Sequence, residues 1–126
     1  MAYICHVIIL LLMRRITLFI LLLSISLCFS YFYRPFIYSN GYFDMYIADT
    51  FPNFFAVPVI ISFMHAFFKN AIKGKRTVLH AFLGVILYEL LQIFTGGFDF
   101  KDILSTIIGT SVLLLFWNKI FLLQKN

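Results

Sequence analysis

The chain has 126 residues, of which 63% are hydrophobic and 12% are charged, and its formal net charge is +5. Soluble domains average roughly 25% charged and 45–50% apolar residues, so this composition excludes an ordinary soluble globular protein. It indicates an integral membrane protein of one domain.

Residues 1–15 form a segment that is too short to cross a membrane, since a crossing helix needs about 20 apolar residues. Met13-Arg14-Arg15 followed by an apolar run is typical of a natural start. We therefore expect either that Met13 is the physiological start or that the first twelve residues lie along the inner interface. The same run resembles a secretory signal peptide with a weak cleavage site at Cys28-Phe29-Ser30. We favour a retained helix, because it gives the even number of spans that the loop charges require.

Four stretches are long and apolar enough to cross the bilayer. They predict an all-α, four-helix membrane domain over residues 16–123, followed by a tail at 124–126, with spans at 16–33, 51–68, 77–95 and 103 to about 123.

Local markers predict where these helices begin and end. Ser39-Asn40-Gly41 is a turn signal, and Gly96-Gly97 is expected to end the third helix. Asp49 or Thr50 is expected to cap the second helix before Pro52, and Asp102 to cap the fourth.

The basic residues sort by loop and predict the orientation. Eight lie on one side and two, Arg34 and Lys101, on the other; the eight are Arg14, Arg15, Lys69, Lys73, Lys75, Arg76, Lys119 and Lys125. The positive-inside rule places the eight and both termini in the cytoplasm. The basic balance is thus a topology signal, and we expect no nucleic-acid partner.

Aromatic residues mark the predicted membrane surfaces. Tyr and Phe residues crowd the segment 31–46 at the outer end of the first span, and Trp117 lies near the inner end of the fourth. Such rings prefer the headgroup level, so we expect the outer loop to lie on the membrane surface.

The fourth span carries small and polar residues at three- and four-residue spacings: Ser105, Thr106, Gly109 and Thr110. Such a stripe lets another helix approach closely. Because the loop from Gly96 to Asp102 is short, the last two helices should be antiparallel neighbours, and we expect the stripe to face the third. It is either plain packing or one wall of a polar pocket.

Glu89 and Gln92 share one face of the third helix, in its outer half. A charged group inside a membrane costs at least about 2.5 kcal/mol unless it is partnered, protonated or reached by water, so Glu89 is a candidate functional residue. The structural alternative is a hydrogen bond to Thr106 or Ser105, or a protonated carboxyl that joins helices.

The pattern from Glu89 onward resembles the VanZ-like family of small four-helix bacterial membrane proteins. The matching residues are Glu89 and Gln92, then Asp99 and Asp102 in the short outer loop, then Gly109 in the next span. The family usually has an arginine where this chain has Thr95-Gly96-Gly97, and asparagine in place of Thr106. The segment Tyr46-Ile-Ala-Asp49 is similar to a related group of small four-helix bacterial proteins with no assigned function.

The resemblance implies a multi-pass protein of the bacterial plasma membrane. The family's namesake is associated with teicoplanin resistance, and that association belongs to the namesake.

We expect a non-enzymatic cell-envelope protein with an outward acidic pocket. Its candidate ligand-binding residues are Glu89, Gln92, Asp99, Asp102, Thr106 and Gly109, with Asp44 and Asp49 as secondary candidates. Expected partners are membrane lipids and a headgroup, cation, cell-wall precursor or glycopeptide, and the chain is free to form a homo-oligomer. Alternatives are a small proton-coupled carrier that uses Glu89, and a purely structural or partner-binding membrane protein.

An enzyme, a cofactor and a metal site are not expected. The histidines, His6, His65 and His80, are inner or terminal while the acids are outer, so no Ser-His-Asp arrangement can form. Two histidines without a third ligand also make a poor metal site.

Overall fold

The computed structural model describes residues 2–68, 72 and 74–122. The predicted tail at 124–126, the loop bases Lys69 and Lys73, and Lys125 lie outside these residues. All secondary structure within them is helical, and four helices are long and apolar enough to cross a membrane. The structure therefore confirms the predicted helical fold and is consistent with a multi-pass membrane protein.

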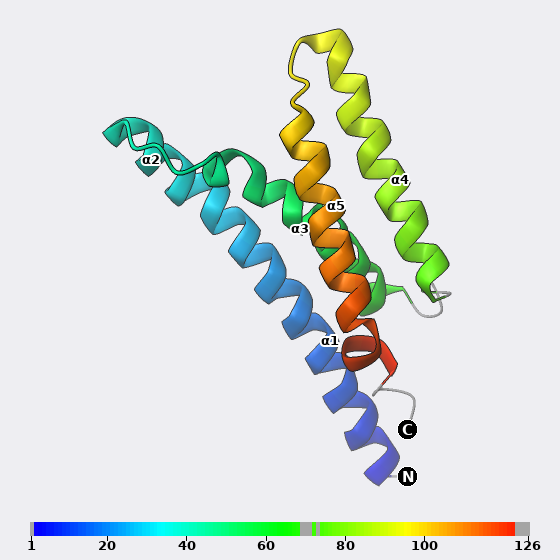
Figure 1. Ribbon diagram of the computed structural model, residues 1–126. Helices are drawn as coiled ribbons and strands as arrows, with labels where there is room; N and C mark the ends of the chain where they lie inside the picture. The colour runs from blue at the N-terminus through cyan, green and yellow to red at the C-terminus, as the bar shows by residue number, and fades with distance from the viewer. Residues whose placement is uncertain (1, 69–71, 73, 123–126) are drawn as a thin grey trace.

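The first helix is longer than the predicted span. Helix α1 (Ala2–Cys28) continues through a π-helical turn, η1 (Phe29–Tyr33), into α2 (Arg34–Asn40), so that the three form one rod (Figure 1). The apolar helix His6–Asn40 has 35 residues, or about 52 Å at 1.5 Å per residue, which exceeds the roughly 30 Å hydrocarbon layer. Residues before Met13 thus extend the same helix, and Arg34 lies on a helix instead of in a loop.

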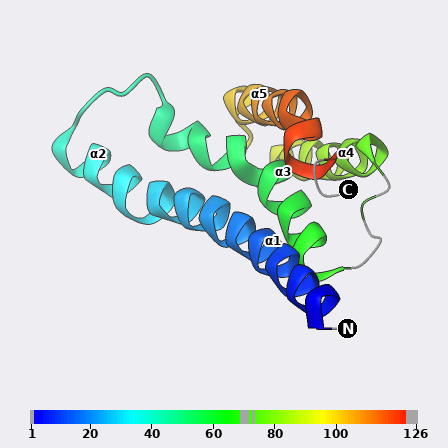
Figure 2. The same ribbon diagram turned by 90° about the horizontal axis from the view of Figure 1, so that it is seen from below.

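Helix α3 (Ile47–Phe67) is the central element. It contacts α1, α4 (Lys75–Leu91) and α5 (Phe100–Trp117), and packs most extensively on α5. Viewed along the bundle, α1 lies on one side of α3 and the α4–α5 pair on the other (Figure 2). Helices α4 and α5 are in contact, as the short connection between them predicts.

Glycines end two of the helices, as predicted. Gly41 follows α2 with a φ of 65°, and Gly96 follows the 3-10 turn η2 (Gln92–Thr95) with a φ of 76°. Both angles lie in the left-handed region that glycine adopts without steric cost, which explains why the chain turns at these positions.

The two predicted caps were wrong. Helix α3 begins at Ile47, and Asp44 Oδ2 accepts a hydrogen bond from the Ala48 N–H at 2.7 Å, so Asp44 takes the role expected of Asp49 or Thr50. Helix α5 is capped by Asp99, whose Oδ1 accepts from the Lys101 N–H at 2.9 Å. Asp102 lies in the first turn, where a negative charge still complements the helix dipole.

Three residues of the small-residue stripe on α5, Ser105, Thr106 and Gly109, lie against α3 and not, as expected, against α4, which is the third predicted span. Ser105 Oγ donates to the Thr50 carbonyl at 2.6 Å, and Thr106 Oγ1 lies 3.4 Å from the Asn53 carbonyl. Gly109 lies directly against the backbone of Phe54. This contact fixes α5 on α3 and makes plain packing the role of the stripe.

The buried core lies toward the opposite end of the same helices. It consists of Val57, Ile61, Val78, Leu113 and Trp117. Trp117 is 5% exposed, so its ring packs in this core instead of facing the surroundings of the bundle. The helix that follows α5 is a π-helical turn, η3 (Asn118–Leu122).

Candidate functional site

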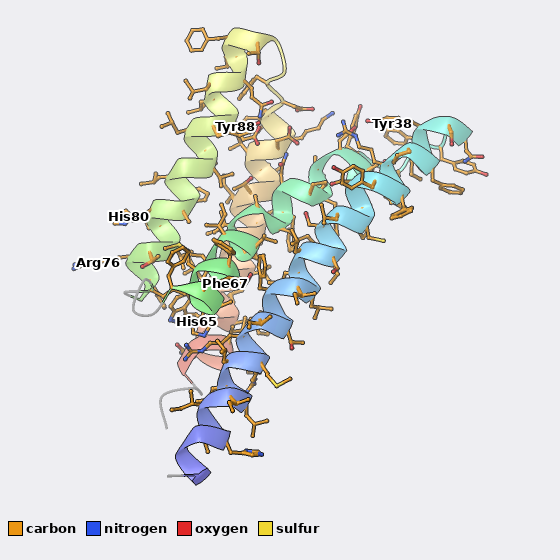
Figure 3. All side chains as sticks on the ribbon, turned by 180° about the vertical axis from the view of Figure 1, so that it is seen from behind. Tyr38, His65, Phe67, Arg76, His80 and Tyr88 are labelled. Atoms are coloured by element: carbon orange, nitrogen blue, oxygen red, sulfur yellow. The ribbon has the colours of Figure 1, made fainter. Side chains whose placement is uncertain are left out.

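A hollow of about 510 Å³ lies at the end of the bundle that holds the loops after α2 and η2. Its floor and walls come from η1, α2, α3, α4, η2, the η2–α5 loop and α5, and most of its lining residues are polar. We call this space the polar hollow. Its lining residues are Ser30, Arg34, Asp49, Pro52, Asn53, Tyr88, Glu89, Gln92, Gly97, Asp99 and Asp102. In Figure 3, Tyr38 and Tyr88 lie toward this end of the molecule, and His65 and Arg76 lie toward the other.

Glu89 is the most deeply buried acid of the polar hollow. The residue is 3% exposed, and its Oε2 accepts a hydrogen bond from Gln92 Nε2 at 2.9 Å. The three-residue spacing on α4 that predicted a shared face thus produces a direct contact. Glu89 is therefore largely covered by the rest of the described chain, with Gln92 as its partner instead of the expected Ser105 or Thr106.

Asp102 lines the hollow from α5, near Asn53 of α3, and is close enough to Glu89 of α4 for the two carboxyl groups to interact electrostatically. Two carboxylates that face one another repel, and a bound cation between them would relieve this repulsion.

Arg34 brings a positive charge to the opposite wall of the hollow. Its Nη2 lies 3.1 Å from Asp49 Oδ1, and the same oxygen accepts a hydrogen bond from the Tyr38 hydroxyl. The Arg34 side chain is 49% exposed, so its remaining donors can be reached by a ligand. Lys101, the other basic residue on the predicted outer side, places its ammonium 3.0 Å from the centre of the Tyr46 ring.

The described lining of the hollow thus holds four carboxyl groups and one guanidinium group. The carboxyl groups are spread over α3, α4, α5 and the residue that caps α5. Acids held in a partly desolvated site favour a positively charged, hydrogen-bonding ligand. Such a ligand reduces the repulsion among the carboxylates and replaces the hydrogen bonds that they would make with water.

The structure brings together most of the predicted site residues. Glu89, Gln92, Asp99, Asp102 and Asp49 line the polar hollow. Three predicted candidates lie elsewhere: Thr106 and Gly109 pack on α3, and Asp44 caps that helix.

Sequence reasoning missed Ser30, Arg34, Asn53 and Tyr88. Arg34 had a usable signal, since it is one of two basic residues on the predicted outer side. Asn53 had another, as an amide one residue after Pro52 inside an apolar span. Ser30 and Tyr88 had no distinguishing signal.

No group of three or more His, Cys, Asp or Glu side chains in the described ranges is arranged to hold a metal ion. Figure 3 shows His80 pointing outward from α4, away from His65 on α3.

A scan of protein-family models, a search of curated proteins and a search of solved structures each gave no significant match.

Proposed function

We propose that this chain is a non-enzymatic, VanZ-like protein of the bacterial cell envelope whose polar hollow binds a positively charged, hydrogen-bonding headgroup at the outer face of the plasma membrane. The observation that carries the proposal is Glu89: an acid that is 3% exposed, held by Gln92, at the bottom of a hollow of about 510 Å³. An ionisable residue inside a membrane bundle is costly and usually marks a functional site. The volume lies within the roughly 300–1,000 Å³ of small-molecule sites.

The charge distribution favours an amine. Glu89 and Asp102 approach from α4 and α5, and Asp99 lies one turn above Asp102. A protonated amine has three donors and can contact more than one of these carboxylates. Arg34 on the other wall is suited to an anionic part of the same headgroup.

Ethanolamine and phosphoethanolamine are soluble probes of this binding. The purified protein in detergent should unfold at a higher temperature as either probe is added, because a ligand that binds the folded state stabilises it. Glu89→Gln and Asp102→Asn should each abolish most of the shift, since they remove charge with little change of shape.

Asp44→Asn is the matched control. Asp44 is an acid at the same end of the bundle that caps α3 and does not line the hollow, and asparagine also caps helices. The control should keep the wild-type response to ethanolamine. Equal responses in the wild type and both hollow variants, or no response in the wild type, would refute the proposal.

A proton-coupled carrier is the second candidate function. It is favoured by the position of Glu89, whose buried carboxyl also borders an apolar space between α3 and α4. Buried carboxylates serve as proton relays in transporters. Proteoliposomes that show no proton-coupled uptake of ethanolamine, with binding intact, would eliminate this function and leave the binding role.

A further inference from the structure

A second hollow, of about 460 Å³, lies between α3 and α4, and its lining is mostly apolar. We call it the α3–α4 groove; its apolar residues are Ala56, Ile60, Ala81, Gly84 and Val85. On each helix these residues recur at three- and four-residue spacings, so each set occupies one face. Ile60 is 38% exposed, which shows that the groove is open toward the surroundings of the bundle.

The groove is continuous with the polar hollow. Asn53, Tyr88 and Glu89 line both spaces. Farther from the loops, the groove is lined on α3 by Ala56 and Ile60 and on α4 by Ala81, Gly84 and Val85, none of which lines the polar hollow. Polar lining therefore gives way to apolar lining along the helix axes, in the order in which a lipid presents its headgroup and its hydrocarbon chain.

The groove is an open space between α3 and α4, and no side chain fills it at Gly84. Small residues on facing helices usually let the backbones approach closely, and this happens at Gly109, where a Cβ would lie 1.9 Å from the Phe54 carbonyl oxygen. At Gly84 a Cβ would meet no atom of the described chain within 4 Å outside its own helix backbone. The small residues of α4 thus border an open space.

We infer that one amphipathic molecule occupies both spaces: a membrane lipid whose amine-bearing headgroup lies in the polar hollow and whose hydrocarbon chain lies in the α3–α4 groove. The inference rests on the proposed function, since the hollow must bind the headgroup. It adds that the affinity for the lipid depends on its hydrocarbon chain, because the groove would bury part of that hydrocarbon chain against Ala56, Gly84 and Val85.

Native mass spectrometry of the purified protein tests this inference, with dioleoyl phosphatidylethanolamine and dioleoyl phosphatidylglycerol as probes. The wild type should retain the ethanolamine lipid in preference to the glycerol lipid. Gly84→Trp should lower its retention by about tenfold, because the indole fills the groove that the chain would occupy. Gly84→Leu, a smaller change that is easier to fold, should lower retention in the same direction.

Leu87→Trp is the matched control, because Leu87 is on the same helix, is 58% exposed and lies outside both spaces. It should retain the lipid like the wild type. Soluble ethanolamine should still stabilise both Gly84 variants, since their polar hollow is unchanged.

The outcomes separate this inference from the proposed function. Wild-type lipid retention in both Gly84 variants would overturn the inference while a persistent response to ethanolamine leaves the proposed function standing. Loss of the ethanolamine response in the wild type itself would overturn both. A third outcome is a wild-type dimer that carries no lipid and that dissociates in the Gly84→Trp variant. It would show that a second copy of the chain occupies the groove, and it would overturn the inference.

Discussion

Gly109 of α5 lies against the backbone of Phe54 of α3 so closely that a Cβ at this position would stand 1.9 Å from the Phe54 carbonyl oxygen. The neighbouring Ser105 donates its hydroxyl to the Thr50 carbonyl of α3, and the Thr106 hydroxyl, which donates to Asp102 of its own helix, lies 3.4 Å from the Asn53 carbonyl. This contact holds the start of α5, with Asp99 and Asp102, against the segment of α3 that carries Asp49 and Asn53. The geometry of the polar hollow therefore depends on a residue that does not line it.

Gly109→Ala should destabilise the protein by about 1–3 kcal/mol, since the methyl group forces the two backbones apart. The measurement is the unfolding temperature of the purified protein in detergent. Gly84→Ala is the matched control: the new methyl group meets no described atom within 4 Å beyond its own helix backbone, so its unfolding temperature should equal or exceed that of the wild type. Similar losses in both variants would contradict the close contact.

Ser105→Ala should cost about 0.6 kcal/mol and at most about 1.7 kcal/mol, the average and the maximum measured for hydrogen bonds between the helices of a membrane protein. The Ser105 hydroxyl donates to the Thr50 carbonyl of α3 at 2.6 Å. Ser111 is the control, because its hydroxyl donates to the Ile107 carbonyl of its own helix at 2.8 Å and the residue is exposed. If Ser111→Ala lowers the unfolding temperature as much as Ser105→Ala, the interhelical bond contributes nothing specific.

These two contacts also show what the sequence could predict and what it could not. Spacing alone identified the stripe on α5 as a packing face, because residues three and four apart share one side of a helix. Periodicity carries no information on which neighbour receives that face, and the short α4–α5 connection favoured the wrong one. The glycine turns at Gly41 and Gly96 were predictable because a left-handed φ is a local requirement.

The same distinction applies to the polar hollow. Glu89 and Gln92 are neighbours within one helix, so their contact follows from spacing. Arg34 reaches the hollow because the first helix continues beyond the predicted span, which places its side chain beside Asp49 of another helix. Such a contact between distant segments follows from tertiary packing and not from any local pattern.

Glu89→Gln should leave the unliganded protein as stable as the wild type or more so, because it removes a group whose charged form is costly in a membrane and keeps a side chain of similar shape. The same variant should lose its response to ethanolamine. The readout is the unfolding temperature with and without that probe. A large loss of stability without ligand would instead mark Glu89 as a structural residue held by Gln92.

Arg34→Gln should change probe preference more than stability. The Arg34–Asp49 pair is half-exposed, and exposed pairs contribute only about 0.2–1 kcal/mol. Phosphoethanolamine should bind roughly two- to fivefold more weakly, since the phosphate loses its cation, whereas ethanolamine should bind as well or better. Weakening of both probes to the same extent would show that Arg34 only positions Asp49.

The orientation of the chain decides whether the polar hollow faces outward, and it rests on the distribution of basic residues. We expect single cysteines at Asn40 and Thr95 to react with a membrane-impermeant maleimide in intact cells, and a cysteine at Lys75 to react only after the membrane is opened. Cys5 and Cys28 are first replaced by serine, because the exposed Cys28 thiol would otherwise contribute to the signal. Asn40 and Thr95 end the helical segments on either side of the hollow, whereas Lys75 begins α4 at the opposite end. The reverse labelling pattern would place the hollow and its acids in the cytoplasm, where a cell-wall precursor or a glycopeptide outside the membrane has no access to Glu89.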